Sequence, residues 1–150
     1  MKIIEDLTSN HILCVAVVSW FTAQVLKTII NLLRTKELNF ERLVGAGGMP
    51  SAHSALVCSL TVATAKQCGL SSPEFAIAFV LAAIVIYDAM GVRRAAGEQA
   101  KVINKLVDSL FKNNNNEDDF MVKQLKELLG HTPLEVLGGS VLGICIALLI

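Results

Sequence analysis

Four stretches of this chain are rich in apolar residues, and more polar segments separate them. The first runs from Ile12 to Leu26 and continues through Leu33, and about 20 residues are enough to cross a bilayer. The others are Ala55 to Ala65, Phe75 to Tyr87, and Val136 to Ile150. This pattern predicts an all-α, integral membrane helical bundle with about four transmembrane helices, formed by a single domain over residues 1–150.

Helix-start signals precede three of these stretches. Pro50-Ser51 comes before the second, with Ser51 as an N-cap or Pro50 in the first turn. Ser72-Pro73-Glu74 comes before the third, and Thr132-Pro133-Leu134-Glu135 has the form of a capping box before the fourth. The second helix is rich in small residues, and the fourth carries Gly138, Gly139 and Gly143. Such residues predict close packing of helices in a membrane.

Between the third and fourth stretches the chain is polar but keeps a helical period. Apolar residues recur from Val92 to Leu110 and basic residues occupy much of the rest, so we expect an amphipathic, interfacial helix on the membrane surface. Four asparagines and three acidic residues at 113–119 predict a mobile loop over about 112–120. A further helical pattern, Met121 to Leu129, stops at Gly130.

Composition supports the membrane interpretation. Of 150 residues, 53% are hydrophobic and 17% are charged, whereas soluble domains are about 25% charged. The mean hydropathy is +0.58. The net charge is zero, so we expect no nucleic-acid partner. No two of the four cysteines have metal-ligand spacing, so we expect them to be reduced and buried, and we expect no metal site.

Basic residues are distributed unequally between the two sides that four spans would define. One side holds the N-terminus, residues 66–72 and the C-terminus, and it carries two basic residues, Lys2 and Lys66. The other side holds residues 34–50 and 91–130, and it carries ten. Positive charge concentrates in cytoplasmic loops, so we expect the second side to face the cytoplasm across the cell membrane.

The unusual polar residues all fall near this predicted cytoplasmic side. Ionisable groups near membrane depth are costly, so they usually point inward and have a function. The set consists of Lys27 and Arg34 near the end of the first helix, Ser51 and His53 at the start of the second, Tyr87, Asp88, Arg93 and Arg94 after the third, and His131 and Glu135 at the start of the fourth.

Each of these residues also has a structural explanation of its own. Lys27 and Arg34 could be snorkelling anchors, Glu135 could complete the capping box, and Asp88 could pair with an arginine. These explanations do not account for the convergence of the whole set on one side. Together the residues suit attack on a phosphate ester, in which cations and helix N-termini bind the phosphoryl oxygens. One histidine, held by a carboxylate, would attack phosphorus, and a second would protonate the leaving group.

Three motifs resemble those of the type-2 phosphatidic acid phosphatase superfamily, relatives of the vanadium haloperoxidases. They are Lys27-x6-Arg34, Pro50-Ser51-Ala52-His53 and His131-x3-Glu135, in this order. The blocks Gly47-Gly-Met-Pro-Ser-Ala-His-Ser-Ala55 and Tyr87-Asp-Ala-Met-Gly-Val-Arg-Arg-Ala-Ala-Gly97 are similar to the divergent bacterial and plant branch of that superfamily. The resemblance covers nearly the whole chain.

The resemblance implies a role for each matching residue. Lys27, Arg34 and Ser51 would bind phosphate. His131 would be the nucleophile, Glu135 would orient it, and His53 would protonate the leaving group. The resemblance also implies a helical bundle with the phosphate site at one end, and catalysis without a metal or other cofactor.

The chain departs from the family pattern at four positions. Thr35 stands in place of Pro, Ala52 in place of Gly, Glu135 in place of Asp, and Leu125 in place of Arg. The last departure removes a phosphate-binding charge. We expect Arg93 or Arg94 to supply it, because both follow the third helix on the correct side.

Two functions fit this sequence. The first is an integral membrane phosphatase that hydrolyses a lipid or isoprenoid phosphate through a phosphohistidine intermediate at the cytoplasmic face. The alternative is a catalytically weak or inactive membrane protein that keeps the fold for binding or assembly. We expect membrane lipids and a phosphorylated lipid or isoprenoid as partners, and homo-oligomerisation is left open.

Overall fold

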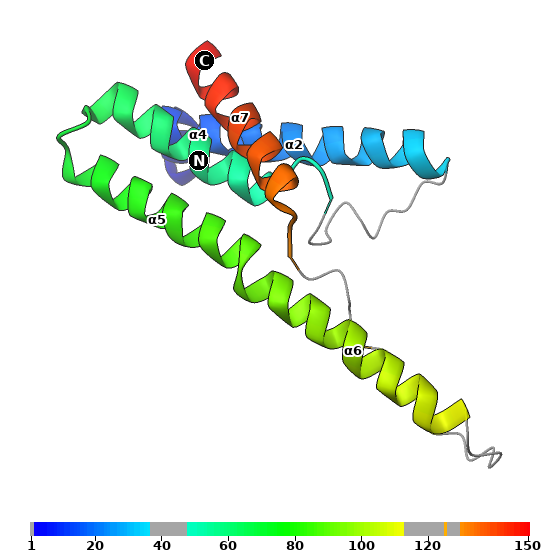
Figure 1. The fold of residues 1–150 in the computed structure, drawn as a ribbon. Coiled ribbons are helices and arrows are strands. Elements are labelled where there is room, and N and C mark those ends of the chain that lie inside the picture. The colour runs from blue at the N-terminus through cyan, green and yellow to red at the C-terminus, as the bar shows by residue number, and fades with distance from the viewer. Residues whose placement is uncertain (1, 37–47, 113–124, 126–129) are drawn as a thin grey trace.

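The computed structural model describes residues 2–36, 48–112, 125 and 130–150, and all regular structure in these residues is helical. The helices are α1 (Lys2–Ser9), α2 (His11–Thr35), α4 (Ala52–Cys68), α5 (Pro73–Met90), α6 (Val92–Lys112) and α7 (Pro133–Leu149). The four apolar stretches lie in α2, α4, α5 and α7, and the amphipathic stretch forms α6 (Figure 1). The all-α prediction is therefore confirmed for the described part of the chain.

Polar side chains start these helices as the sequence predicts. The Ser72 hydroxyl accepts a hydrogen bond from a first-turn backbone N–H of α5. At α7, the Thr132 hydroxyl accepts from the Glu135 N–H and the Glu135 carboxylate accepts from the Thr132 N–H, so the predicted capping box is present. Ser51 is the N-cap of α4, which decides between the two predicted starts of that helix.

Helix α4 lies at the centre of the bundle and contacts α2, α5 and α7. The α4–α7 contact depends on glycine. A Cβ atom built on Gly139 would lie 3.0 Å from the carbonyl carbon of Ser51, and one built on Gly143 would lie 2.9 Å from the Cα of Ala55. Because a side chain at either position would collide with the α4 backbone, the two helices approach this closely only through glycine. The predicted close packing at Gly139 and Gly143 is confirmed.

Small residues also bring α2 onto α4. Ala23 of α2 packs with Ala52 and Ala55 at the start of α4, and Val15 packs with Ala63 near its end. The two helices therefore run antiparallel, and the C-terminal part of α2 lies against the first turns of α4. This arrangement places Lys27, one turn after Ala23, at the level of the α4 N-terminus.

Apolar side chains on the outer faces of the bundle are exposed, among them Phe21, Ile77 and Leu137, as expected of a protein surrounded by lipid. Two helical stretches of the described chain are long and apolar enough to cross a membrane, His11–Leu33 and Pro73–Ser109. Helices α4 and α7 have 17 residues each. Two of the four predicted spans thus meet the requirements of a transmembrane helix, and the other two stay predictions.

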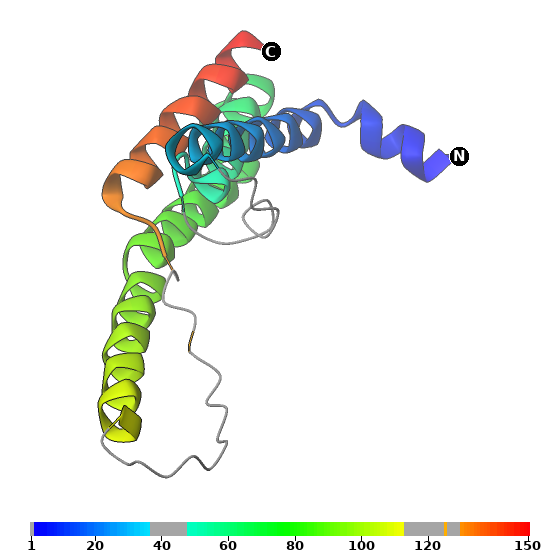
Figure 2. The ribbon, with the colours of Figure 1, turned by 90° about the vertical axis from the view of Figure 1, so that its right-hand side faces the viewer.

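Helix α6 follows α5 after a single break at Gly91 and extends away from α2, α4 and α7, as both views of the ribbon show (Figures 1 and 2). Its position on a membrane surface stays a prediction. The predicted loop at about 112–120 and the helical pattern at 121–129 lie outside the described residues, apart from Lys112 and Leu125.

One expectation about the cysteines is wrong. All four are free thiols, but Cys68 and Cys145 are exposed and Cys14 and Cys58 are only partly buried. Alanine and serine are the commonest buried residues of the described chain, and such small residues permit closer helix contacts than Cys does. The thiols accordingly lie toward the outside.

The α4–α7 contact predicts a difference between two adjacent glycines. Gly139→Ala should lower the free energy of unfolding by about 1–3 kcal/mol, the usual range for overpacking, because its Cβ meets α4 backbone. Gly138→Ala is the matched control, since its Cβ would lie 3.3 Å from the flexible end of Met49 and at an ordinary 3.9 Å from the Met49 Cγ and the Pro50 Cβ. Thermal unfolding in detergent measures both, and an equal effect of the two substitutions would contradict this packing account.

Candidate active site

Three helix ends meet through backbone hydrogen bonds at one end of the bundle. The Ser51 N–H, at the start of α4, donates to the Glu135 carbonyl in the first turn of α7 at 2.9 Å. The His131 N–H, just before α7, donates to the Ala89 carbonyl near the end of α5 at 3.1 Å. The N-cap N–H of a helix and the last carbonyls of a helix lack partners within the helix, so these bonds satisfy groups that would otherwise be unpaired.

The two predicted catalytic histidines lie next to each other at this junction. The ring centroids of His53 and His131 are 6.3 Å apart, and the rings are inclined at 79° in an edge-to-face arrangement. His131 is buried, whereas His53 is exposed. The prediction that the imidazoles meet at one end of the bundle is confirmed, and their catalytic roles stay predictions.

Lys27 reaches the same end of the bundle from α2. Its residue surface is only 6% exposed, and its aliphatic stem passes Gly48, just before α4. A Cβ on Gly48 would lie 3.1 Å from the Lys27 Cδ and 3.2 Å from its Cγ, and the Gly48 φ is +95°. Glycine at position 48 therefore permits both the positive φ and the close contact with the aliphatic stem of Lys27. Burying an ammonium group is costly, which favours a function that uses its charge.

The Ser51 hydroxyl is fully buried and takes part in a small polar cluster. It accepts hydrogen bonds from the Ser54 N–H at 3.3 Å and from the Ser54 hydroxyl at 3.0 Å. A hydroxyl has two acceptor positions and one proton, so the proton is what Ser51 has left to offer a ligand. Sequence reasoning did not single out Ser54, although the Ser51-x2-Ser54 spacing on a helix start was a usable signal.

Glu135 makes the contacts of a capping residue. One carboxylate oxygen, Oε2, accepts from the Thr132 N–H at 3.0 Å, and the Glu135 carbonyl accepts from Ser51. This contact is the structural explanation that the sequence already offered. The orientation of His131 by Glu135 stays a prediction. The carboxylate has further acceptor positions that could receive a ring N–H.

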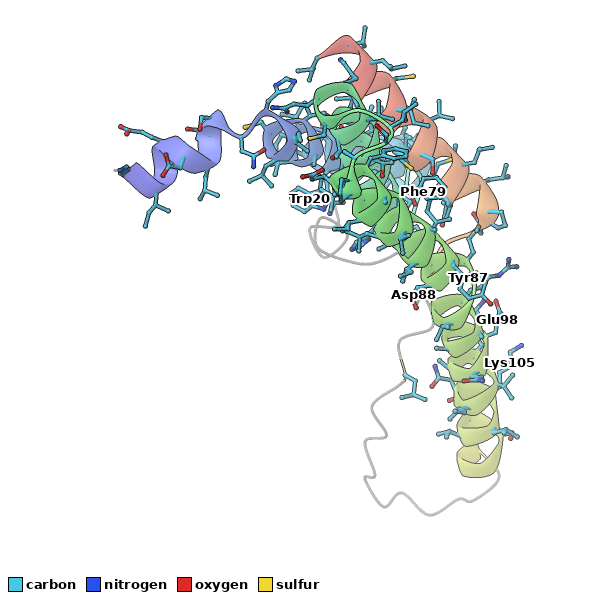
Figure 3. The ribbon with its side chains drawn as sticks, turned by 90° about the vertical axis from the view of Figure 1, so that its left-hand side faces the viewer. Trp20, Phe79, Tyr87, Asp88, Glu98 and Lys105 are labelled. Atoms are coloured by element: carbon cyan, nitrogen blue, oxygen red, sulfur yellow. The ribbon has the colours of Figure 1, made fainter. Side chains whose placement is uncertain are left out.

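The predicted arginines are only partly described. Arg34 and Arg93 lie in α2 and α6, but their side chains are outside the described part of the structure. Arg94 is exposed in the first turn of α6. Tyr87 and Asp88 mark the end of α5 beside this turn, and Tyr87 is exposed (Figure 3).

Leu125 occupies the position where the family pattern has an arginine, and its backbone is hydrogen-bonded to α6. The buried Asn104 of α6 donates to the Leu125 carbonyl at 2.9 Å and accepts from the Leu125 N–H at 3.0 Å. The Ala89 carbonyl accepts a hydrogen bond from the His131 backbone. Asn104, which holds Leu125, comes 15 residues after Ala89, and this spacing corresponds to about 22 Å of helix. Sequence reasoning missed this amide clamp, because the partner is a backbone segment distant in sequence.

The described residues contain no group of three or more His, Cys, Asp or Glu placed to hold a metal ion. The described residues at this end of the bundle supply two imidazoles, an ammonium group, a hydroxyl proton and a carboxylate.

Because of the Ser51 cluster, removing the Ser51 side chain should destabilise the protein more than removing an ordinary N-cap does. Ser51→Ala should lower the free energy of unfolding by about 2–4 kcal/mol, which combines the loss of an N-cap with the unpaired, buried Ser54 hydroxyl. Ser72→Ala is the control, because it removes a cap with no buried hydroxyl partner and should cost only about 1 kcal/mol. Thermal unfolding compares the two, and equal losses would contradict the cluster.

Comparisons with known proteins identify the family of the chain. The model of the Divergent PAP2 family matches residues 8–146. The chain is 41% identical over 152 residues to the "Uncharacterized membrane protein YuiD" of Bacillus subtilis (strain 168), an alignment that covers 97% of this chain and 96% of that protein. No solved structure matches the chain. With its apolar helices and its converging motifs, the chain is a membrane protein that belongs to the divergent PAP2 family.

Proposed function

We propose that this protein is a membrane phosphatase that hydrolyses a lipid or isoprenoid phosphate at the cytoplasmic end of its helical bundle. The observation that carries the proposal is the His53–His131 pair, 6.3 Å apart at the N-termini of α4 and α7, with the buried Lys27 at the same end. Hydrogen bonds span roughly 3 Å, so one tetrahedral oxyanion is large enough to contact both imidazoles.

Phosphate binding would use charge and helix ends together. The N-termini of α4 and α7 each carry a partial positive charge and backbone N–H groups, which favour an anion. Lys27 adds a full charge beside them, and the Ser51 proton adds a hydrogen bond. We assign Arg34 to the same task from its place two turns after Lys27 on α2.

The reaction would proceed in two displacements. A ring nitrogen of His131 attacks phosphorus, the P–O bond to the alcohol breaks, and protonated His53 gives its proton to the leaving alkoxide. Water then attacks the phosphohistidine, His53 takes the proton from that water, and inorganic phosphate leaves as the P–N bond breaks. Glu135 would bind the other ring N–H of His131 and keep the attacking nitrogen unprotonated.

A non-catalytic binding or assembly role is the second candidate, and the placement of Leu125 favours it. The family arginine is absent there, and Asn104 holds Leu125 beside α6, about 22 Å of helix away from the residue that binds His131. If no other cation replaces that arginine, the protein would bind an oxyanion without efficient turnover.

Activity of histidine variants tests the first candidate. Protein purified in detergent should release phosphate from at least one substrate in a panel of lipid and isoprenoid phosphates. His53→Ala should lower kcat by about 10²–10⁴-fold, the usual range for general acid–base catalysis, and His131→Ala should abolish turnover.

His11→Ala is the matched control, because His11 is exposed at the start of α2, at the opposite end of that helix from Thr35. Wild-type protein that binds vanadate but hydrolyses nothing in the panel would favour the binding role. Undiminished turnover by His131→Ala would contradict the mechanism.

The cation that replaces the family arginine can be identified by oxyanion binding. Either Arg93→Ala or Arg94→Ala should weaken vanadate binding by about ten- to a hundredfold, equivalent to about 1.5–3 kcal/mol for a charged hydrogen bond. Lys105→Ala is the control, since Lys105 is exposed farther along α6 (Figure 3). Leu125→Arg should not strengthen binding while Asn104 holds that residue. Unchanged affinity in both arginine variants would assign the arginines to lipid head groups instead.

A further inference from the structure

One buried polar group near the candidate active site has an unmet hydrogen bond. Gln24 of α2 is 9% exposed, and its side-chain oxygen, Oε1, is enclosed and accepts no hydrogen bond from the residues that the structure describes. A buried amide oxygen without a donor is unfavourable, and such groups in native proteins usually have a ligand or water partner. Nothing in the mechanism above uses this oxygen.

Gln24 lies on the part of α2 that borders the site. It precedes Lys27 by three residues, so the two share one face of the helix. The neighbouring Ala23 packs against Ala52 and Ala55 of α4, which places this turn of α2 at the level of Ser51 and His53. An acceptor and a cation therefore share one face of α2, at the level where α4 begins.

We propose that Gln24 is a specificity-determining residue that accepts a hydrogen bond from an O–H group of the phosphorylated ligand. The inference rests on the proposed function, because it needs an oxyanion beside Lys27. An amide oxygen repels the lone pairs of a fully ionised phosphate and attracts only a donor, so the group it meets must carry a proton.

The donor has two chemical sources. One is the phosphate itself, which keeps one O–H as a monoanion and loses it above a second pKa of about 6 in a monoester. The other is a hydroxyl on a carbon next to the phosphoester, as in a glycerol phosphate. An isoprenoid phosphate has no such hydroxyl, so the second source would select hydroxylated phosphate esters over isoprenoid ones.

The test compares wild-type protein with Gln24→Met, which keeps the length of the side chain and removes the acceptor. Calorimetry in detergent measures two preferences: inorganic phosphate over sulfate, which has no O–H, and glycerol 1-phosphate over propyl phosphate at about pH 8, where both esters are fully ionised. Thr28→Val is the control, because the Thr28 hydroxyl already donates to its own helix at 2.9 Å.

Wild-type protein should bind the preferred ligand of one pair about five- to tenfold more tightly, the affinity difference expected from one neutral hydrogen bond. Gln24→Met should lose this preference, and Thr28→Val should keep it. Loss of the phosphate–sulfate preference identifies the phosphate O–H as the donor. Loss of the glycerol phosphate preference identifies a carbon hydroxyl and hence the substrate class.

Two other results would overturn the inference. If Gln24→Met binds all four ligands as the wild type does, the amide serves only the bundle interior, and the proposed function is unaffected. If wild-type protein binds none of the ligands and releases no phosphate from the lipid panel, the proposed function fails together with the inference.

Discussion

The close approach of α4 and α7 is the constraint on which the rest of the structure depends. Gly139 and Gly143 allow the backbones of the two helices to meet, and the same contact lets the Ser51 N–H reach the Glu135 carbonyl. This bond fixes the two helix N-termini at one level, which sets His53 beside His131. If the two helices crossed at a larger distance, the imidazoles and the two positive helix ends would move apart. The geometry at the end of the bundle therefore depends on packing in its apolar interior.

Local signals in the sequence predicted helices α2, α4, α5, α6 and α7, but they did not predict α1. Pro73 and Pro133 sit at helix starts, Ser51 and Thr132 are caps, and these positions depend only on neighbours a few residues away. The meeting of the histidines was also predictable, because consecutive antiparallel helices return the chain to the same end. Sequence could not show the Gly48–Lys27 contact or the Asn104–Leu125 clamp, since each joins segments whose relative placement depends on packing.

Two positions of the family pattern make contacts in this structure that the pattern does not indicate. Glu135 matches the pattern's carboxylate, yet its observed bond is to the Thr132 N–H, so a capping role and a catalytic role would share one side chain. Leu125 departs from the pattern, and its two hydrogen bonds with Asn104 give this residue a structural role on α6. In the proposed function, Lys27, Ser51 and two helix N-termini would bind phosphate, and turnover would depend on a further cation at this site.

Binding of vanadate can be observed by solving the structure of the protein in its presence, because vanadate takes the trigonal geometry of a phosphoryl group in transfer. We expect vanadium bonded to a ring nitrogen of His131, with its oxygens within hydrogen-bond distance of Lys27 and the Ser51 hydroxyl, and with His53 facing the apical oxygen. Vanadate bound away from the two histidines, or no vanadate at this end of the bundle at a saturating concentration, would contradict this expectation.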